Sequence, residues 1–519
     1  MARGRLMVDS GRPPGAGRRV SRRQAVGLLG RLGLGVGGAA ALAGCDSTEG
    51  VGTVAAPTDE RTETTPAGLP DSVTERTTGR SGVAATTSEQ SAAREPVIVE
   101  FATDSIYGPR GAAMQWGLRR LAEVRPEIYV KLDPNENPTL RFASDSAPHV
   151  ALIHHHDFLS LRGEGAYTDV TDVVRQMQVV SKDYYVVPDT HTFDGLDHSY
   201  PPPQTTGGPQ YGMPFQFEIS GFVGNVSLAE NSGVELPASE NSWSWDDWTE
   251  WDAKMTDAEA GTWGTWVRPD YLYQYMPQMY SNGLKKPFDE GLSKTMFDQP
   301  EALEAWEYLI NKIFVHRTSP LPDQVKAISG EYQEPFAAGK IGIWPSGRVY
   351  ATGFTVPFIK DRFRWTLLPA VVTGRGEPPG HGVNAKPNLI TSSAMRDGLV
   401  EPSVALAVFL ASEEFQGRVG IDRGHMPVHK VALESPDSLA PPPDGMSWLK
   451  VYADRPDNRG LFPFGAWRDW WTRHLQIANA GWDGSQAPAK ALAACQAWGE
   501  EVLSTYEEPR PFVREPVYP

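Results

Sequence analysis

Short apolar runs alternate with amphipathic segments along most of the chain. "VIVEFATD" (97–104) is an apolar run that ends in polar residues, which predicts a buried strand opening into a loop. The next segment, 111–128, carries Met114, Leu118 and Leu121 at helical spacing. "IYVKLDP" and "PHVALIHHHD" predict two further strands. This order of elements predicts an α/β fold with a mostly parallel sheet.

The later segments predict mainly helices. "SWSWDDWTEWDAKMTD" has Asp246 and Asp247 in the first turn of a helix, where carboxylates face the positive end of the helix dipole. "QPEALEAWEYLINKIF" places Pro300 at a helix start, ahead of an apolar stripe. "EPSVALAVFLASEEFQGRVG" predicts one helix, and "FGAWRDWWTRHLQIANAG" and "APAKALAACQAWGEEVL" predict two closing helices. "YPPPQTTGGPQ" predicts a loop, because proline has no backbone N–H to donate.

Residues 1–45 have the composition of an export signal. They contain the spacing G-x-G-x-x-G at Gly33, Gly35 and Gly38. A dinucleotide-binding turn must follow a strand, whereas these glycines follow an arginine-rich leader and precede "AAALAGC", so the pattern favours a cleaved signal peptide. The apolar run is also too short and too rich in glycine to predict a membrane span.

The end of this signal indicates how the chain is anchored. Leu42-Ala43-Gly44-Cys45 resembles the lipobox of bacterial lipoproteins, in which the cysteine is acylated and becomes the new N-terminus. Arg22-Arg23 resembles a twin-arginine export signal, although Arg31 interrupts the apolar run. An ordinary secretory signal with a long basic leader is the alternative. Cys45 is therefore the predicted lipidation site.

Residues 46–95 predict a disordered tether. They are rich in Thr, Ser, Ala, Glu and Pro and contain almost no large apolar side chains, so they cannot bury enough surface to fold. A flexible segment of this length reaches roughly 40 Å. The remaining residues, 96–519, are too many for a single hydrophobic core, which predicts two lobes.

Charge and cysteine content exclude several classes of partner. The whole chain has a formal net charge of −16; removing the eight Arg and one Asp of the signal leaves 40 basic and 63 acidic residues, a net charge of −23. Such a surface repels phosphate backbones, so nucleic acid is not an expected partner. Cys495 is the only thiol left and lies in an Ala-rich helical pattern, which predicts a buried apolar role and no internal disulfide.

Five segments together resemble a known family. They are "AYTDVTDVV", "YGMPFQFEISGFVGNVSLAENSGVELPASENSWSWDDW", "FAAGKIGIWPSGRVY", "NAKPNLITSSAMRDGLVEPSVALAVFLASEEFQGRVG" and "GHMPVHK". Their order, behind a lipobox, resembles the extracellular solute-binding proteins of ABC importers, the family that includes maltose-binding-protein-like sugar-binding lipoproteins. The resemblance spans most of 97–519.

This resemblance implies a type II periplasmic-binding-protein fold, in which two α/β lobes joined by hinge crossings close around a ligand. The lobes implied are 96–217 with 371–433, and 218–370 with 434–519. The implied partners are a small polar solute, expected to be a carbohydrate, the permease subunits of an ABC importer, and the membrane through the lipid anchor. A monomer on the outer face of the cell membrane is expected, with no cofactor, no metal and no catalytic residue.

Polar residues at two strand ends are candidate ligand contacts, because ligands of open α/β sheets lie beyond the carboxyl ends of strands. Asp104 and Tyr107 follow the first predicted strand, and His154, His155, His156 and Asp157 follow "VALI". Imidazole and carboxylate groups suit sugar hydroxyls. Consecutive residues seldom chelate one ion, so the histidines do not favour a zinc site. A solvated strand end remains the alternative.

Aromatic residues are the second candidate group, because a sugar's C–H face stacks on a flat ring. Trp263 and Trp266 in "GTWGTW" lie on a predicted loop, and Trp344 lies on a predicted strand. By resemblance, Tyr273 and Trp467 stand where relatives present stacking rings. Core packing is the alternative for every tryptophan.

Three further candidates lie at the predicted crossings and turns. Phe217 and Glu218 stand at the first crossing, where Glu218 either reaches the ligand or holds the hinge. Arg348 replaces a tryptophan common in relatives, and a guanidinium there suits a carboxylate or a hydroxyl rim.

Two other functions stay open from the sequence. One is a secreted hydrolase or metal-dependent enzyme built on His154–Asp157, although G-x-S-x-G, H-E-x-x-H and Walker motifs are absent from the sequence. The other is a sensor or adhesion lipoprotein of the same fold. The sequence names neither the solute nor the export route.

Overall fold

The computed structural model describes residues 96–505, with gaps at 135–140, 143–145, 154–157, 159–160, 162–164, 186–208, 269–271, 286, 290–292, 331–333, 347–358, 360–361, 376–381, 456–458 and 461–466. The predicted signal peptide, Cys45 and the predicted tether lie outside the described residues. All described residues belong to one compact unit.

The first sheet joins strands from distant parts of the sequence. Its strand order is β10-β9-β3-β1-β2, and β4 also pairs with β9. β1 is parallel to β2 and β3, whereas β9 is antiparallel to β3 and β4. The expectation of a parallel sheet is therefore met by β1, β2 and β3 and by the pair of β9 with β10, and is wrong for the pairs of β9 with β3 and β4, because the chain returns to this sheet in the opposite direction. The strands are β1 (Val97–Ala102), β2 (Ile128–Asp133), β3 (Val150–Leu152), β4 (Gly212–Ile219), β9 (Gly382–Ile390) and β10 (Arg459–Gly460).

Apolar spacing explains why β1 and the following helix α2 (Gly108–Val124) pack together. Val99 and Phe101 lie on one face of β1 and are fully buried, whereas Ile98 is exposed and Glu100 is half-buried. Met114 and Leu121 of α2 are buried as well, and Leu118 packs against the same core. The predicted strand and helix are both confirmed. Because α2 begins soon after the strand ends, its first turn lies at the carboxyl end of β1.

The second sheet has the strand order β6-β7-β5-β8. Its strands are β5 (Gly221–Asn225), β6 (Trp263–Thr265), β7 (Ile341–Ser346) and β8 (Trp365–Leu368). Helix α6 (Val226–Asn231) follows β5, and α7 (Trp245–Met255) begins with a capping box between Ser244 and Asp247. The acidic helix start predicted at this position is confirmed. The loop predicted around Trp263 is wrong, because "WGT" pairs with β7 as a parallel strand.

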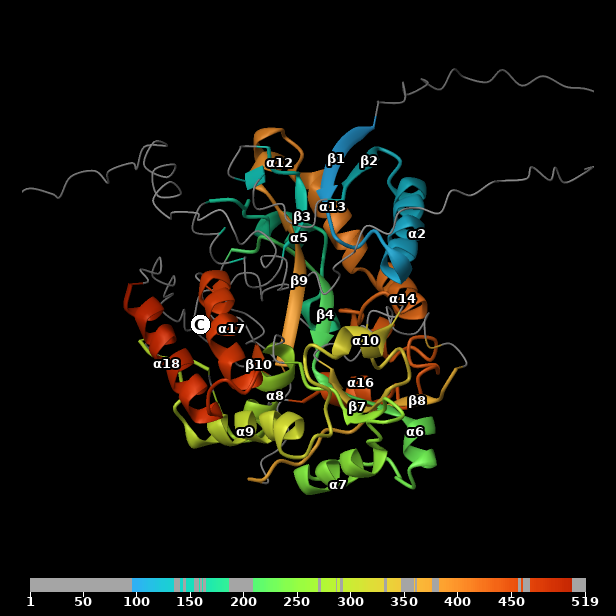
Figure 1. The fold of residues 1–519 in the computed structure, drawn as a ribbon. Helices are drawn as coiled ribbons and strands as arrows, with labels where there is room; N and C mark the ends of the chain where they lie inside the picture. The colour runs from blue at the N-terminus through green and yellow to red at the C-terminus, as the bar shows by residue number, and fades with distance from the viewer. Residues whose placement is uncertain are drawn as a thin grey trace, which may run out of the picture. The chain divides into compact units, whose positions relative to one another are not determined.

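Four helices form an aromatic core of their own. They are α8 (Leu272–Ser281), α9 (Pro300–Phe314), α17 (Trp467–Trp482) and α18 (Pro488–Thr505), and α17 lies beside α18 (Figure 1). Tyr275, Trp306, Trp470 and Trp482 are fully buried among them. Several of the tryptophans thus stabilise the fold. Cys495 of α18 is buried as predicted, and burial raises the pKa of its thiol to about 12.

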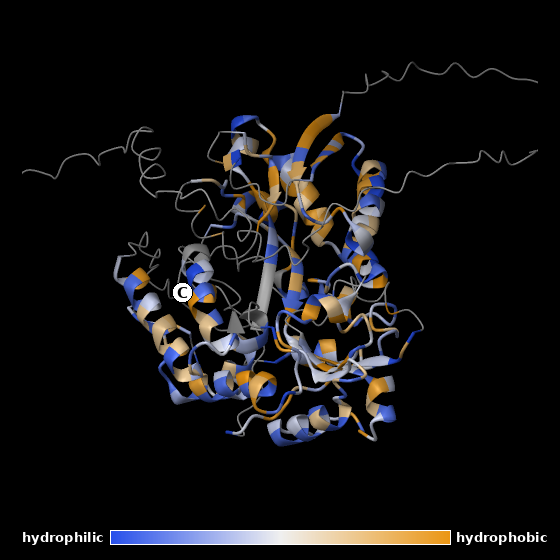
Figure 2. Ribbon diagram, in the orientation of Figure 1, coloured by the Kyte–Doolittle hydropathy of each residue, from blue (hydrophilic) through white to orange (hydrophobic). Residues whose placement is uncertain are grey.

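A strongly apolar helix covers the first sheet. Helix α13 (Val400–Ala411) is coloured mostly as hydrophobic in Figure 2 and contacts β1, β4 and β9. The single helix predicted over this region is wrong: α13 ends before Ser412, whose hydroxyl accepts a hydrogen bond from the backbone N–H of Phe415 and so begins α14 (Glu413–Asp422). Shorter helices are α5 (Thr171–Gln176), η1 (Ser181–Asp183), α10 (Val325–Ser329), α12 (Ser392–Arg396), α15 (Lys430–Glu434) and α16 (Trp448–Ala453).

The chain passes from the first sheet to the second between Ile219, which ends β4, and Gly221, which begins β5. It returns between β8 and β9. These passages lie close to the predicted lobe boundaries at 217/218 and 370/371. The short strand β10, by contrast, pairs with β9 of the first sheet although its residues were assigned to the second lobe. The lobe boundaries stay a prediction.

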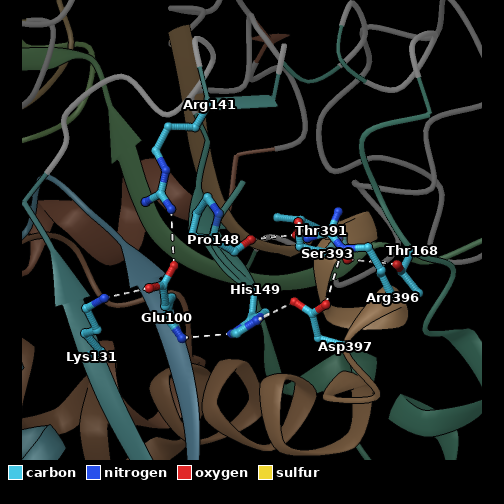
Figure 3. Close-up of polar contacts among 10 residues, drawn as sticks. All are labelled: Glu100, Lys131, Arg141, Pro148, His149, Thr168, Thr391, Ser393, Arg396 and Asp397. Atoms are coloured by element: carbon cyan, nitrogen blue, oxygen red, sulfur yellow. Dashed lines mark hydrogen bonds and ion pairs between the residues drawn. The ribbon is translucent and has the colours of Figure 1, made fainter. Parts of the chain in front are cut away.

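A polar network joins β1, β2, β3 and α12 (Figure 3). The carboxylate of Glu100 pairs with Lys131 Nζ at 2.7 Å and with Arg141 at 3.1 Å. The backbone N–H of Glu100 donates to Nδ1 of His149 at 3.0 Å. The proton of the neutral ring therefore lies on Nε2, which is 3.2 Å from Oδ2 of Asp397. His149 thus connects the middle of β1 to the end of α12.

We expect this last contact to make stability depend on acid pH. The hydrogen bond from His149, and then that from Arg396, lowers the pKa of Asp397. Because the pKa is lower in the folded state, the stabilisation is complete above the unfolded-state pKa and is lost as the pH falls through the folded-state pKa. Asp397→Asn should lower the melting temperature slightly at pH 7 and have no effect below that range. Thermal melts from pH 7 to pH 2 test this, and an equal difference at every pH would contradict it.

Candidate functional site

The loop after β1 holds the best-placed candidate, Asp104. Its turn is closed locally, because Thr103 Oγ1 accepts a hydrogen bond from the backbone N–H of Ser105 at 3.1 Å. The carboxylate of Asp104 accepts from Ser105 Oγ at 3.1 Å and pairs with Nζ of Lys386 at 3.2 Å. Lys386 lies on β9 and is 1% exposed, whereas the side chain of Asp104 is 21% exposed. The carboxyl end of β1 therefore presents the partly exposed carboxylate of Asp104, which is paired with the buried ammonium of Lys386.

A second buried ion pair lies next to the first. Arg110, in the first turn of α2, donates through Nε to the carbonyl of Gly424 at 3.1 Å. One of its terminal nitrogens is 3.7 Å from Oε1 of Glu218, and the side-chain amide of Gln216 donates to the same oxygen. Arg110, Gln216 and Glu218 are all buried. The sequence places them together because α2 begins where β1 ends, and β4 pairs with the strand that carries Lys386.

Electrostatics fix the protonation states of this group. Burial alone would raise the pKa of Asp104, but the charges of Lys386 and Arg110 outweigh it and hold that pKa well below its usual range. Burial, followed by the charge of Arg110, lowers the pKa of His425 to about 3, so its ring is neutral at physiological pH. Nδ1 of His425 lies 3.1 Å from the carbonyl oxygen of Met426 and so carries the proton. Its Nε2 is then an acceptor, and it is buried without a hydrogen-bond partner.

We call Asp104, Arg110, Gln216, Glu218, Lys386 and His425 the strand-end cluster. It contains two carboxylates, two cations and a neutral imidazole, so its formal charge is balanced. Asp104 is the member with the most exposed side chain. An ionised, partly exposed carboxylate is a strong acceptor for hydroxyl or N–H donors of a bound solute.

Two tryptophans predicted as ligand contacts, Trp266 and Trp344, lie at the parallel strands β6 and β7 of the second sheet. Trp266 follows β6 and Trp344 lies on β7, and their rings stack with centroids 5.5 Å apart. Arg268 lies over the ring of Trp266 at 5.5 Å, and Phe336 packs on Trp344. Both indoles are buried by these neighbours. In this structure they pack as core residues at the carboxyl edge of the sheet, and ligand contact by either ring stays a prediction.

The remaining predicted residues fall into three groups. Tyr107 is 60% exposed at the start of α2, Trp263 is half-buried, and Phe217 is buried against Tyr185. Tyr273 lies in the first turn of α8 and Trp467 is the first residue of α17. The residues outside the described part of the chain are His154, His155, His156, Asp157 and Arg348. The structure therefore brings together Asp104 and Glu218 of the predicted set.

Comparison with known proteins decides the family. The family model described as "Bacterial extracellular solute-binding protein" matches residues 133–393, half of the chain. The chain is a member of this family. No curated protein matches it by sequence.

Solved structures of solute-binding proteins share the fold at low sequence identity. An ABC substrate-binding protein from Listeria monocytogenes, in complex with cycloalternan, is 18% identical with a TM-score of 0.65, over 79% of this chain and 100% of that one. The GacH receptor of Streptomyces glaucescens, solved unliganded and with acarbose, is 15% identical with a TM-score of 0.62, over 79% and 99%. UgpB from Mycobacterium tuberculosis, in complex with glycerophosphocholine, is 14% identical with a TM-score of 0.61, over 79% and 98%. The predicted type II periplasmic-binding-protein-like fold is confirmed.

Two observations complete the description of this solute-binding protein. Within the described ranges, no group of three His, Cys, Asp or Glu side chains is placed to hold a metal ion. A search of the same residues finds no helix with the length and apolar character that crossing a bilayer requires.

The sequence reasoning missed four members of the strand-end cluster: Arg110, Gln216, Lys386 and His425. A signal for one of them was present, because Lys386 in "GVNAKPNLI" is a charged residue within a strand buried on both faces, where lysine needs a partner. The partners of Arg110, Glu218 and Gly424, are distant from it in sequence, and no local pattern predicts these contacts.

Proposed function

We propose that this chain is a lipid-anchored extracellular solute-binding protein that captures a carbohydrate and delivers it to an ABC importer. The observation that carries the proposal is Asp104, an ionised and partly exposed carboxylate at the carboxyl end of β1, followed three residues later by the exposed ring of Tyr107. Sugar recognition needs both features: a directed acceptor for hydroxyl groups and a flat apolar face.

Family membership supports solute capture, and the solved relatives support the class of solute. The Listeria and Streptomyces proteins were solved with cycloalternan and acarbose, both saccharide-like compounds. The complex of UgpB with glycerophosphocholine supplies the contrasting class, a charged phosphodiester. In the strand-end cluster, Lys386 and Arg110 are engaged by carboxylates, which favours a neutral hydroxylated solute over an anion.

A thermal-shift screen tests the class of solute. The saccharide panel contains cycloalternan, acarbose, maltotriose, mannotriose and a chitin oligosaccharide, with glycerophosphocholine as the contrasting compound. A ligand at 100 times its Kd stabilises the native state by about 2.7 kcal/mol, which raises the melting temperature by several degrees. We expect such a shift with at least one saccharide and none with glycerophosphocholine. The reverse pattern would replace the carbohydrate by a phosphodiester solute.

Exchange of Tyr107 tests the site itself. Tyr107→Ala should weaken saccharide affinity about three- to tenfold, because a stacking ring contributes about 1 kcal/mol. Stability should hardly change, since the side chain is 60% exposed. Tyr129→Ala is the matched control, because Tyr129 is 58% exposed and lies on β2, away from the strand-end cluster. Calorimetric titration measures the saccharide affinity of both variants. Equal affinities of Tyr107→Ala and Tyr129→Ala would show that Tyr107 does not contact the solute.

Anchoring and delivery have separate tests. Cys45→Ser should release the chain from the membrane fraction, and mass spectrometry of the parent should find acyl groups on Cys45. Uptake of a labelled saccharide by cells that carry the importer should depend on the chain. Binding without any effect on uptake would instead support a sensor or adhesion lipoprotein.

A further inference from the structure

The strand-end cluster lies where the chain leaves and re-enters the first sheet. Glu218 is the last residue but one of β4, and Gly221 opens β5 of the second sheet. Lys386 lies on β9, the first strand after the chain returns from the second sheet. β4 and β9 pair from Gly212 to Ile219, and Gln216 stands directly opposite Lys386. The two ion pairs therefore hold both strands that lead into and out of the second sheet.

Resting on the proposed function, we propose that Arg110 is a positioning residue that couples the occupancy of Asp104 to the crossing strands. Nε of Arg110 donates to the carbonyl of Gly424, a terminal nitrogen of its guanidinium is 3.7 Å from Oε1 of Glu218, and its charge also lowers the pKa of Asp104. Glu218 is the last residue but one of β4, whereas Asp104 is partly exposed and is the proposed ligand contact. A change at Asp104 is thereby passed to Glu218 through Arg110.

The physical basis is the cost of leaving a buried charge without a partner. Lys386 and Arg110 are both buried, so each must keep an anionic neighbour. A solute that donates hydrogen bonds to Asp104 competes with Lys386 and Arg110 for the negative charge of the Asp104 carboxylate. Arg110 then depends more strongly on Glu218 and on the carbonyl of Gly424, which shifts the populations of the conformations that the crossing strands adopt. Ligand binding at Asp104 is thus coupled electrostatically to β4 and β9, the strands that lead into and out of the second sheet.

The test measures the crossing in the protein without ligand. Spin labels are attached at Arg175→Cys on α5 and Glu250→Cys on α7, whose native side chains are 72% and 63% exposed. Cys45→Ser prevents the spin label from reacting at position 45. Cys495 is buried and so is not accessible to the label. Pulsed electron paramagnetic resonance gives the distribution of distances between the labels. We expect Glu218→Gln and Arg110→Gln each to change the population of the less frequent label-to-label distance about tenfold.

The control is Arg120→Gln, on the same helix α2, which removes exposed ion pairs with Glu123 and Glu414 and should leave the distribution unchanged. Glu218→Gln keeps the size of the side chain and its acceptor for Gln216, so it decides the result even where Arg110→Gln unfolds. A distribution for folded Glu218→Gln that superimposes on the parent's would overturn the inference. Because no solute is present, that outcome is distinct from a failure of the saccharide screen, which would overturn the proposed function.

Discussion

Replacing Lys312 by Met should lower the free energy of unfolding by about 3–5 kcal/mol. Lys312 of α9 and Asp252 of α7 form an ion pair of 2.8 Å, and both side chains are 0% exposed. The ammonium also lies over the rings of Trp248 at 4.2 Å and Tyr308 at 4.6 Å. Burial raises the pKa of Asp252 and lowers that of Lys312, so the charged pair persists only because each group supplies the other's counter-ion. The variant leaves a buried carboxylate alone.

The double variant Lys312→Met/Asp252→Leu is the decisive control. Two apolar side chains of similar volume remove both desolvation penalties, so the double variant should recover most or all of the parent's stability. Denaturant unfolding followed by circular dichroism measures all three proteins. Additive losses in the double variant would show that the two groups stabilise the fold through contacts other than their ion pair.

Asp104→Asn should affect both stability and binding. The substitution removes the counter-ion of buried Lys386, which we expect to lower the free energy of unfolding by about 3 kcal/mol. It also weakens an acceptor for the solute. A hydrogen bond to a charged group contributes about 1.5–3 kcal/mol, so saccharide affinity should fall about 10- to 100-fold.

A second substitution separates these two roles of Asp104. Lys386→Met added to Asp104→Asn removes the unpartnered cation, and stability should return toward that of the parent. The affinity should stay weak, because the carboxylate is still missing. Unfolding curves and calorimetric titrations of the single and double variants are compared at one pH. An affinity that recovers together with stability would assign Asp104 a purely structural role.

Local patterns predicted most of the elements. The buried strand at 97–102, the stripe of Met114 and Leu121, and the helix start at Pro300 follow from periodicity and helix-terminus chemistry, which act over a few residues. The two errors have different causes. Ser412 divides one apolar stripe into two helices by accepting the N–H of Phe415, a cap that an apolar pattern hides. "WGT" within "GTWGTW" is a strand because it pairs with β7, and no local signal specifies that partner.

The site was less accessible to sequence reasoning than the fold. Asp104 could be named because it follows a predicted strand, and Glu218 because the family resemblance places it at the first crossing. Their partners could not be named, because Lys386 is 282 residues from Asp104 and Gly424 is 314 residues from Arg110. Composition also fails to separate binding rings from core rings: Trp266 and Trp344 cover each other at a strand edge, whereas Tyr107 is exposed.

Calorimetric titration of the purified chain with each member of the saccharide panel tests the central claim most directly. The account predicts saturable one-to-one binding of at least one saccharide, lost or strongly weakened in Asp104→Asn/Lys386→Met. Absence of heat with every saccharide, from a protein that melts cooperatively, would contradict it.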